Sequence, residues 1–159
     1  KIPLASVTLS ATTTSVTFGS ISQSYTDLIL VANFTNVGGD AKLVFNSDTG
    51  SNYSLTYLVG SGSAASSGRA SNQSNGFYLD QYGSLGNVLN TFIFNIMNYS
   101  NTSTYKTTLN RWAIGNSAYP TSLAQVNLWR STSAISTVSI QSQAQGFASG
   151  STFNLYGIL

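Results

Sequence analysis

The sequence predicts an all-β fold, a single jelly-roll-like β-sandwich of about eleven short strands that spans residues 1–159. Its apolar residues occur in short runs that are rich in β-branched and aromatic side chains, which favour strands. Gly, Asn, Ser and Asp, which are typical of turns, separate these runs. At this length one hydrophobic core can be stable without disulfides, and the chain contains no Cys.

Two patterns identify strands in the first half of the chain. Leu28–Ala32 is apolar at every position, which favours a strand at the centre of a sheet. Large side chains at alternate positions between Tyr53 and Val59 give the period of two of a half-buried strand. The strands expected in this half are Leu4–Ser10, Ser15–Ser20, Asp27–Thr35, Ala41–Asn46 and Tyr53–Val59.

The second half contains one segment with conflicting patterns, Leu85–Met97. Its apolar residues recur at the i, i+3, i+4, i+7 spacing of an amphipathic helix. The residues between them are mostly Gly, Asn and Thr, which are poor helix formers, and Phe92, Phe94 and Ile96 also alternate as in a strand. We therefore predict a strand, with a helix as the alternative. The strands expected in this half are Phe77–Tyr82, Leu89–Met97, Thr104–Ile114, Leu123–Arg130, Ile135–Gln141 and Thr152–Leu159.

The longest stretch of low complexity is Gly60–Gly76, with the sequence GSGSAASSGRASNQSNG. Its composition predicts a mobile surface loop between two strands. The alternative interpretation is a contact arm, in which Arg69 is the only charged residue.

Charged residues make up 6% of the chain, against about 25% in an average globular protein. The net charge is +2, and Ser, Thr and Asn, with 27, 18 and 15 copies, predict a surface of hydroxyl and amide groups. The few cations are too scattered to form the dense basic face of a nucleic-acid binder. No apolar run is long enough to span a bilayer. The sequence thus predicts neither nucleic acid nor a membrane as a partner.

The missing residue types also argue against catalysis. The chain has no His, Cys or Glu, so the commonest general base and the thiol nucleophile are absent. A Ser–Lys dyad through Lys42 or Lys106 is the remaining arrangement. Asp27, Asp40 and Asp48 lie beside predicted turns, where Asp commonly caps the backbone. We expect no enzymatic activity, no catalytic residue and no cofactor.

The segment Asn46–Asn52 has two interpretations. Its alternating oxygen-bearing side chains and Gly50 are similar to a short calcium loop, which makes Asp48 a weak candidate metal ligand. A single carboxylate is a poor ligand set for a hard divalent ion. We therefore favour a tight turn in which Gly50 supplies a positive φ.

Aromatic residues are the remaining candidates for binding. An exposed ring can stack on a sugar, whereas packing in the core is the alternative for each ring. Trp129 and Arg130 end a predicted strand, where the functional interpretation is cation–π stacking or an interface anchor. The candidates for sugar stacking are Tyr53, Tyr57, Tyr78, Tyr82, Trp112 and Trp129.

Six segments spread over nearly the whole chain carry a family resemblance. They are YTDLILV at Tyr25–Val31, FNSDTGSNYS at Phe45–Ser54, GSGSAASSGRASNQ at Gly60–Gln73, IMNYSNTSTYKT at Ile96–Thr107, LWRSTSAIS at Leu128–Ser136 and FASGSTFNLYGI at Phe147–Ile158. Together they resemble a family of virion proteins of tailed bacteriophages, whose members are structural, tail-fibre-like or capsid decoration proteins. The resemblance implies a particle component and provides no catalytic residue.

We therefore predict a non-enzymatic virion protein on the particle surface, in the capsid decoration or a tail fibre, which assembles with itself and with other virion proteins. A homotrimer is expected, because few Lys or Pro residues protect the sheet edges and the phage proteins that it resembles are commonly threefold. The contact surface is expected at Gly60–Gly76 or at Trp129 and Arg130. The alternatives are an adhesin that binds a host surface glycan and a carbohydrate-binding module of a secreted enzyme. An adhesin should expose several aromatic rings in a groove, whereas an assembly protein should bury them.

Overall fold

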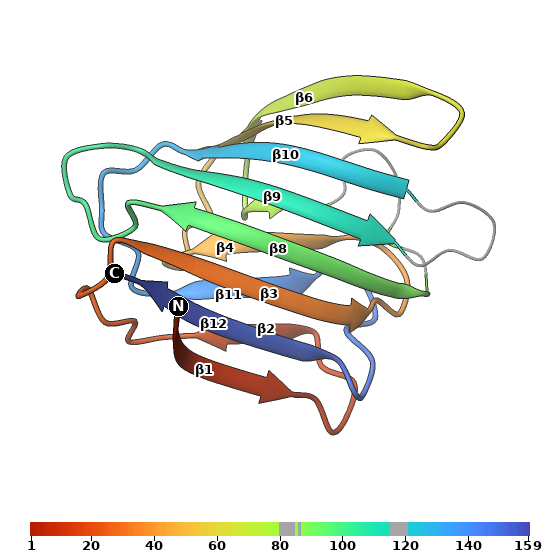
Figure 1. Cartoon of the computed structure of the whole chain (residues 1–159), viewed down its shortest axis with the longest axis horizontal. Coiled ribbons are helices and arrows are strands. Elements are labelled where there is room, and N and C mark those ends of the chain that lie inside the picture. Colours follow the sequence, from red (N-terminus) through yellow and green to blue (C-terminus); the bar gives the residue numbers. More distant parts are fainter. Residues whose placement is uncertain (80–84, 86, 115–120) are drawn as a thin grey trace.

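The computed structural model describes residues 1–79, 85, 87–114 and 121–159, and within these residues it confirms the all-β prediction (Figure 1). The described residues contain twelve strands and no helix. The strands form two antiparallel sheets that pack face to face, as in a β-sandwich. Apart from the two-residue strand β7, every predicted strand forms with boundaries within three residues of those expected.

The larger sheet has eight strands and forms the front layer of Figure 1. Its centre is the pair β8 and β9, which belongs to the meander β8–β9–β10 and is flanked on the other side by β3. In spatial order its strands are β1 (Ile2–Thr8), β12 (Thr152–Ile158), β3 (Asp27–Thr35), β8 (Leu89–Met97), β9 (Lys106–Ile114), β10 (Thr121–Trp129), β5 (Tyr53–Gly60) and β6 (Ala65–Gln73).

The smaller sheet forms the layer behind it, in the order β2 (Ser15–Phe18), β11 (Val138–Ser142), β4 (Ala41–Phe45) and β7 (Phe77–Tyr78). Each strand of the small sheet lies between two strands of the large sheet in the sequence. The chain therefore crosses repeatedly between the layers. Of the expected strand Phe77–Tyr82, the structure shows β7 at Phe77–Tyr78. The candidate Tyr82 lies outside the described residues, as do the other residues of the expected strand beyond 79.

The core lies between the two sheets and is rich in stacked rings. Along β3 and β8 every second residue is buried, because successive side chains of a strand point to opposite faces. Phe34 contacts Phe92 and Phe147 at ring-centroid distances of 5.7 and 4.9 Å. Phe45 packs on Trp129 at 5.6 Å and joins the two layers. The segment with conflicting patterns is therefore a strand over Leu89–Met97, as predicted.

The prediction of a loop at Gly60–Gly76 is wrong for most of that segment, because Ala65–Gln73 forms strand β6. β6 pairs with β5 along its length and is the edge strand of the large sheet. It has no apolar alternation because little of it is buried. Packing explains the glycine at position 68, because a Cβ there would lie 2.5 Å from the Tyr57 hydroxyl oxygen.

Candidate functional surface

Asp48 is the centre of a hydrogen-bonded turn between β4 and β5. Its Oδ1 accepts from the backbone N–H of Gly50 at 2.8 Å, and its Oδ2 accepts from Asn52 Nδ2 at 2.9 Å and Trp129 Nε1 at 2.7 Å. The Tyr53 hydroxyl donates to the carbonyl oxygen of Asp48 at 3.0 Å. The turn is therefore fastened to the end of β10 and to the start of β5.

The expected positive φ at Gly50 is wrong, because the left-handed residues of this turn are Asn46 and Ser47, with φ of 49° and 54°. Gly50 is instead closely approached: a Cβ there would lie 2.8 Å from Asn52 Nδ2, so the Asn52 side chain would have to shift. The turn interpretation is thus the better one for this segment.

The electrostatics of Asp48 are those of a hydrogen-bonded turn. Burial opposes its ionisation, but the hydrogen bonds from Trp129, Asn52 and Gly50 together outweigh burial and hold the pKa of the carboxyl below its ordinary value. Both carboxylate oxygens already accept protein donors. Among the described residues no three acidic side chains come together as candidate metal ligands.

Trp129 and Tyr53 belong to the core, so neither can stack on a sugar or anchor an interface. Their exposed fractions are 2% and 0%. Their rings contact each other and also the small-sheet residues Phe45 and Phe77. Burial also raises the pKa of the Tyr53 phenol above its usual range. The position of Trp129 near a strand end hid its burial, because β10 ends under the turn that carries Asp48.

Arg130 ties three segments together and is not stacked on Trp129. Its guanidinium donates to Ser54 Oγ and to the carbonyl oxygen of Ser51, both at 2.5 Å, and to Asn72 Oδ1 at 2.8 Å. These acceptors lie on β5, on the turn before it and on β6. Arg130 thus fixes the edge hairpin to the sheet.

The other aromatic candidates lie in three different places. Trp112 is buried, and its Nε1 donates to Asn90 Oδ1 at 3.1 Å. Tyr57 is half-buried against Gly68, and Tyr78 lies under the Lys42 ammonium at 4.2 Å from the ring centroid. Among the described aromatic residues Tyr105 is the exposed one, and it stands outside the strands.

Within the described part of the chain, neither lysine of the hypothetical dyad donates to a serine hydroxyl. Lys42 Nζ donates to the carbonyl oxygen of Ser74 at 2.9 Å. Lys106 Nζ donates to the carbonyl oxygens of Thr104 and Thr132 at 2.7 and 3.2 Å. Burial lowers the pKa of Lys106, but its hydrogen bonds are those of a structural ammonium.

A buried group of polar side chains, which we call the polar square, lies on the inner face of β9 and β10. It consists of Thr108, Asn110, Gln125 and Asn127. Gln125 donates to Asn127, Asn127 to Thr108, and Thr108 to Asn110, at 2.7 to 2.9 Å. Asn110 and Gln125 are directly opposite in register, and Asn110 Nδ2 and Gln125 Oε1 have no hydrogen-bond partner among the described residues. The square satisfies itself almost completely, which is the pattern of a structural network.

The outer face of the large sheet, turned away from the small sheet, carries unusual apolar surface. Leu58, Leu109 and Val126 have exposed fractions of 63%, 46% and 47%. Strand register places Val126 directly beside Leu109, and Leu58 beside Ala124 of β10. These side chains line an open hollow of about 540 Å³ together with Thr56, Asn95, Arg111 and other residues of the same strands.

The apolar surface continues onto the neighbouring strands. Asn95 pairs in register with Leu109 and with Ile29, and Ile93 pairs with Arg111 and with Val31. We define the outer face by twelve of the outward side chains of β3, β8, β9, β10, β5 and β6. They are Asp27, Ile29, Val31, Ile93, Asn95, Leu109, Arg111, Ala124, Val126, Thr56, Leu58 and Arg69.

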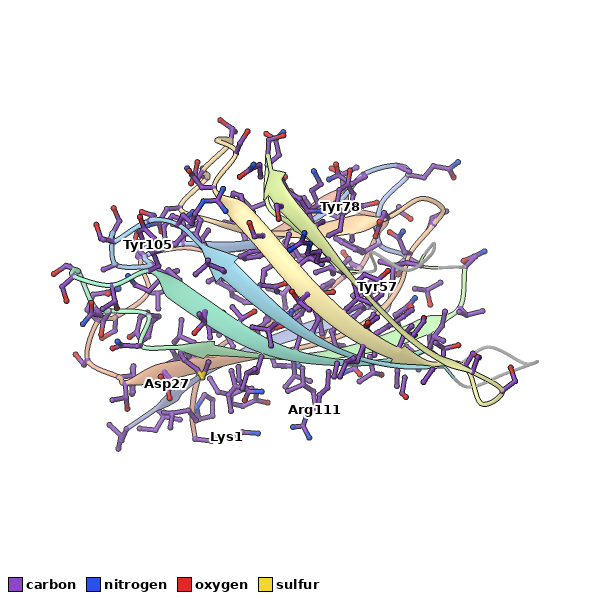
Figure 2. All side chains as sticks on the ribbon, turned by 90° about the horizontal axis from the view of Figure 1, so that it is seen from above. Lys1, Asp27, Tyr57, Tyr78, Tyr105 and Arg111 are labelled. Carbon is purple, nitrogen blue, oxygen red and sulfur yellow. The ribbon has the colours of Figure 1, made fainter. Side chains whose placement is uncertain are left out.

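The charges on the outer face are separated. Arg111 lies on the central strand β9, Arg69 lies on the edge strand β6, and Asp27 is the first residue of β3. Figure 2 shows Arg111 and Asp27 on the same side of the large sheet, with Tyr78 on the opposite side. The candidate Arg69 is exposed and lies on this face, opposite Thr56.

Sequence reasoning did not find the outer face. Its residues are distant in sequence and become neighbours through strand order. The sequence does carry a weak signal of this face. In β9 and β10, apolar residues occur at positions that point to opposite faces of the sheet, such as Leu109 and Trp112. Such strands are apolar on both sides of a sheet.

A scan of protein-family models and a search of curated protein sequences find no match to this chain. Within the described residues there is no helix with the length and apolarity needed to cross a membrane.

Proposed function

We propose that this protein is a non-enzymatic structural component of a tailed-phage particle, where it assembles at the surface with copies of itself and with other virion proteins. The family resemblance of the sequence motivates the particle, and the outer face motivates assembly. The single observation that carries the proposal is the exposed apolar cluster of Leu58, Leu109 and Val126 on the outer face of the large sheet. Contiguous apolar surface of this kind marks interaction sites in soluble proteins.

The distribution of aromatic rings favours assembly over glycan binding. A sugar site needs exposed rings in a groove, but the described tryptophans are buried and Tyr53 is in the core. The hollow of the outer face is lined by Leu58, Leu109 and Val126, and the aromatic residue among its described lining residues, Tyr57, is half-buried against Gly68. Aliphatic side chains of this kind fit another protein surface better than the hydroxyl groups of a polysaccharide.

The threefold assembly expected from sequence stays a proposal. The edge strand β1 carries Pro3 and a register shift, which are devices that protect an edge. The opposite edge strand β6 has small side chains and a single charge, Arg69, so it is the edge on which a neighbouring copy would pair.

The function is tested on purified particles of the phage whose genome encodes this chain. Quantitative mass spectrometry of gradient-purified particles should find the protein in many copies per particle. Its absence from intact particles, with presence in the lysate, would overturn the proposal. A glycan array with the purified protein tests the adhesin alternative, for which specific binding is the expected result.

A further inference from the structure

We propose that the outer face of the large sheet packs against the outer face of a second copy of this chain, and that Arg111 of each copy faces Asp27 of the other. This inference rests on the proposed function, because it names the partner of the assembly surface. Three properties of the face support it, which are the burial that the face needs, the charges that it carries and the area that it offers.

The outer face needs a cover, because apolar side chains occupy both of its central rows. One row runs through Ile29, Asn95, Leu109 and Val126, and the next through Val31, Ile93, Arg111, Ala124 and Leu58. Side chains on β3 and β8 are half-buried, whereas those on β5, β9 and β10 are largely exposed. Covering this area removes apolar surface from water at about 25 cal/mol per Å².

The charges of the face identify a copy of the chain as the cover. Arg111 and Asp27 are two strands and four residues apart in register, a separation of about 16 Å from sheet spacings, so they do not pair within one chain. A two-fold contact is reciprocal: if one residue meets another across the interface, the reverse contact forms as well. Two copies can therefore pair Arg111 with Asp27 on both faces at once, while Arg69 lies apart on the edge strand β6.

Register also locates the two-fold axis. Asn95 lies midway between Arg111 and Asp27. Its strand, β8, lies between β9 and β3, and along the strand direction Asn95 is two residues from the position of Arg111 and two residues from that of Asp27. An axis in the plane of the interface, passing over Asn95 and perpendicular to the line from Arg111 to Asp27, exchanges these two residues between copies. The strands of the two copies then cross at a large angle, which is one of the two arrangements of packed sheets.

The available area is sufficient for a stable pair. Two whole sheets that cross over Asn95 overlap in a patch about 24 Å wide and about 25 Å long, from the standard strand spacing and rise. It buries about 600 Å² per copy, or about 1,200 Å² in total, which exceeds the area of ordinary crystal contacts. The remaining polar rows of the sheet, such as Asn33 and Thr91, form a rim.

Two substitutions at similarly exposed positions test whether the outer face mediates self-association, which sedimentation velocity measures. Leu109→Glu places a charge at the centre of the interface and should weaken self-association by at least about a hundredfold. Tyr105→Glu is the control, because Tyr105 is 54% exposed but lies outside the outer face. Equal association of both variants, or a wild-type protein that stays monomeric at about 100 micromolar, would overturn the inference.

A mixing experiment tests the charge register. Arg111→Glu and Asp27→Lys should each associate about tenfold more weakly, because each places like charges together. An equimolar mixture should recover the affinity, since the introduced glutamate of one variant then meets the introduced lysine of the other, while the unchanged Arg111 meets the unchanged Asp27.

The turn at Asp27 needs its own control. Asp27 Oδ1 also accepts from the backbone N–H of Asn98 at 2.6 Å, so Asp27→Asn checks the fold of this turn. If Asp27→Lys unfolds, the charge register can be tested with Arg111→Ala, Asp27→Asn and the double variant. The pairing predicts that their effects on the free energy of self-association are not additive. Absence of recovery and of non-additivity overturns the register.

The two proposals fail in different ways. A mass of two copies, or of six if the threefold edge contact also forms, supports the face pair, and a mass of three contradicts it. If the pair forms but particles lack the protein, the proposed function is wrong and the interface stands. If particles contain the protein but Leu109→Glu associates normally, the interface is wrong and the function stands.

Discussion

Trp129 connects the core to the only charged side chain of its turn, Asp48. The indole packs against Phe45 and Tyr53, and its Nε1 donates to a carboxylate at 2.7 Å. A hydrogen bond to a charged acceptor stabilises a fold more than one to a neutral acceptor. The indole of Trp112 makes the corresponding hydrogen bond to a neutral acceptor, because its Nε1 donates to the amide oxygen of Asn90.

These two indoles provide a matched comparison. Trp129→Phe should lower the free energy of unfolding by about 1.5–3 kcal/mol through the lost hydrogen bond, in addition to the cost of the smaller ring. Trp112→Phe should lose about 1 kcal/mol through its hydrogen bond, with a similar cost of size. Urea unfolding of both variants gives the comparison. Equal losses would mean that Asp48 does not contribute through its charge.

Asp48 also predicts a dependence of stability on pH. Its pKa is lower in the folded chain than its ordinary value of 3.8, so its contribution is present above that value and is lost as pH falls through the folded pKa. Urea midpoints of Asp48→Asn and the wild type should therefore converge below about pH 4. A difference that stays constant down to about pH 2 would contradict this role.

At the element scale, β6 shows where sequence patterns lose their information. An edge strand that is mostly exposed does not need apolar alternation, so Ala65–Gln73 resembles a loop in composition. β8 shows the opposite case, because Phe92, Phe94 and Ile96 carry the period of two that its burial requires. Patterns of apolar residues thus report burial, and strands without burial are invisible to them.

The strand character of β6 can be tested with neighbouring residues. Gly68→Val should lower the free energy of unfolding by about 1–3 kcal/mol, because its Cβ would meet the Tyr57 hydroxyl at 2.5 Å. Ser67→Val should be neutral or stabilising, since Ser67 is exposed and Val favours strands. Urea unfolding measures both. If this segment is a free loop, both substitutions should be equally well tolerated.

At the scale of the whole molecule, the layered arrangement could be predicted from composition and alternation, but the assembly of surfaces could not. The sequence shows which residues of each strand point to the core and which point outward, but it does not show the order of the strands in the sheet. Leu58, Leu109 and Val126 become one patch only because β5, β10 and β9 are neighbours. The candidates Trp129 and Tyr53 were misplaced for the same reason, since the small sheet that covers them is known only from the fold.

The low charge of the chain agrees with this arrangement of the surface. With 6% charged residues, the protein can bring copies close together with little electrostatic repulsion. The few charges on the outer face can then select the register of the contact, because unlike charges are favoured and like charges are excluded across an interface. Arg111 and Asp27 have this role in the proposed pair.

The most direct test is a density map, at side-chain resolution, of the phage particle in which we propose that this chain assembles. We predict that copies of this chain meet through the outer face, with Leu109 buried and Arg111 beside Asp27 of the neighbouring copy. A map in which the outer face of every copy is open to solvent, or is covered by a different protein, would contradict this account.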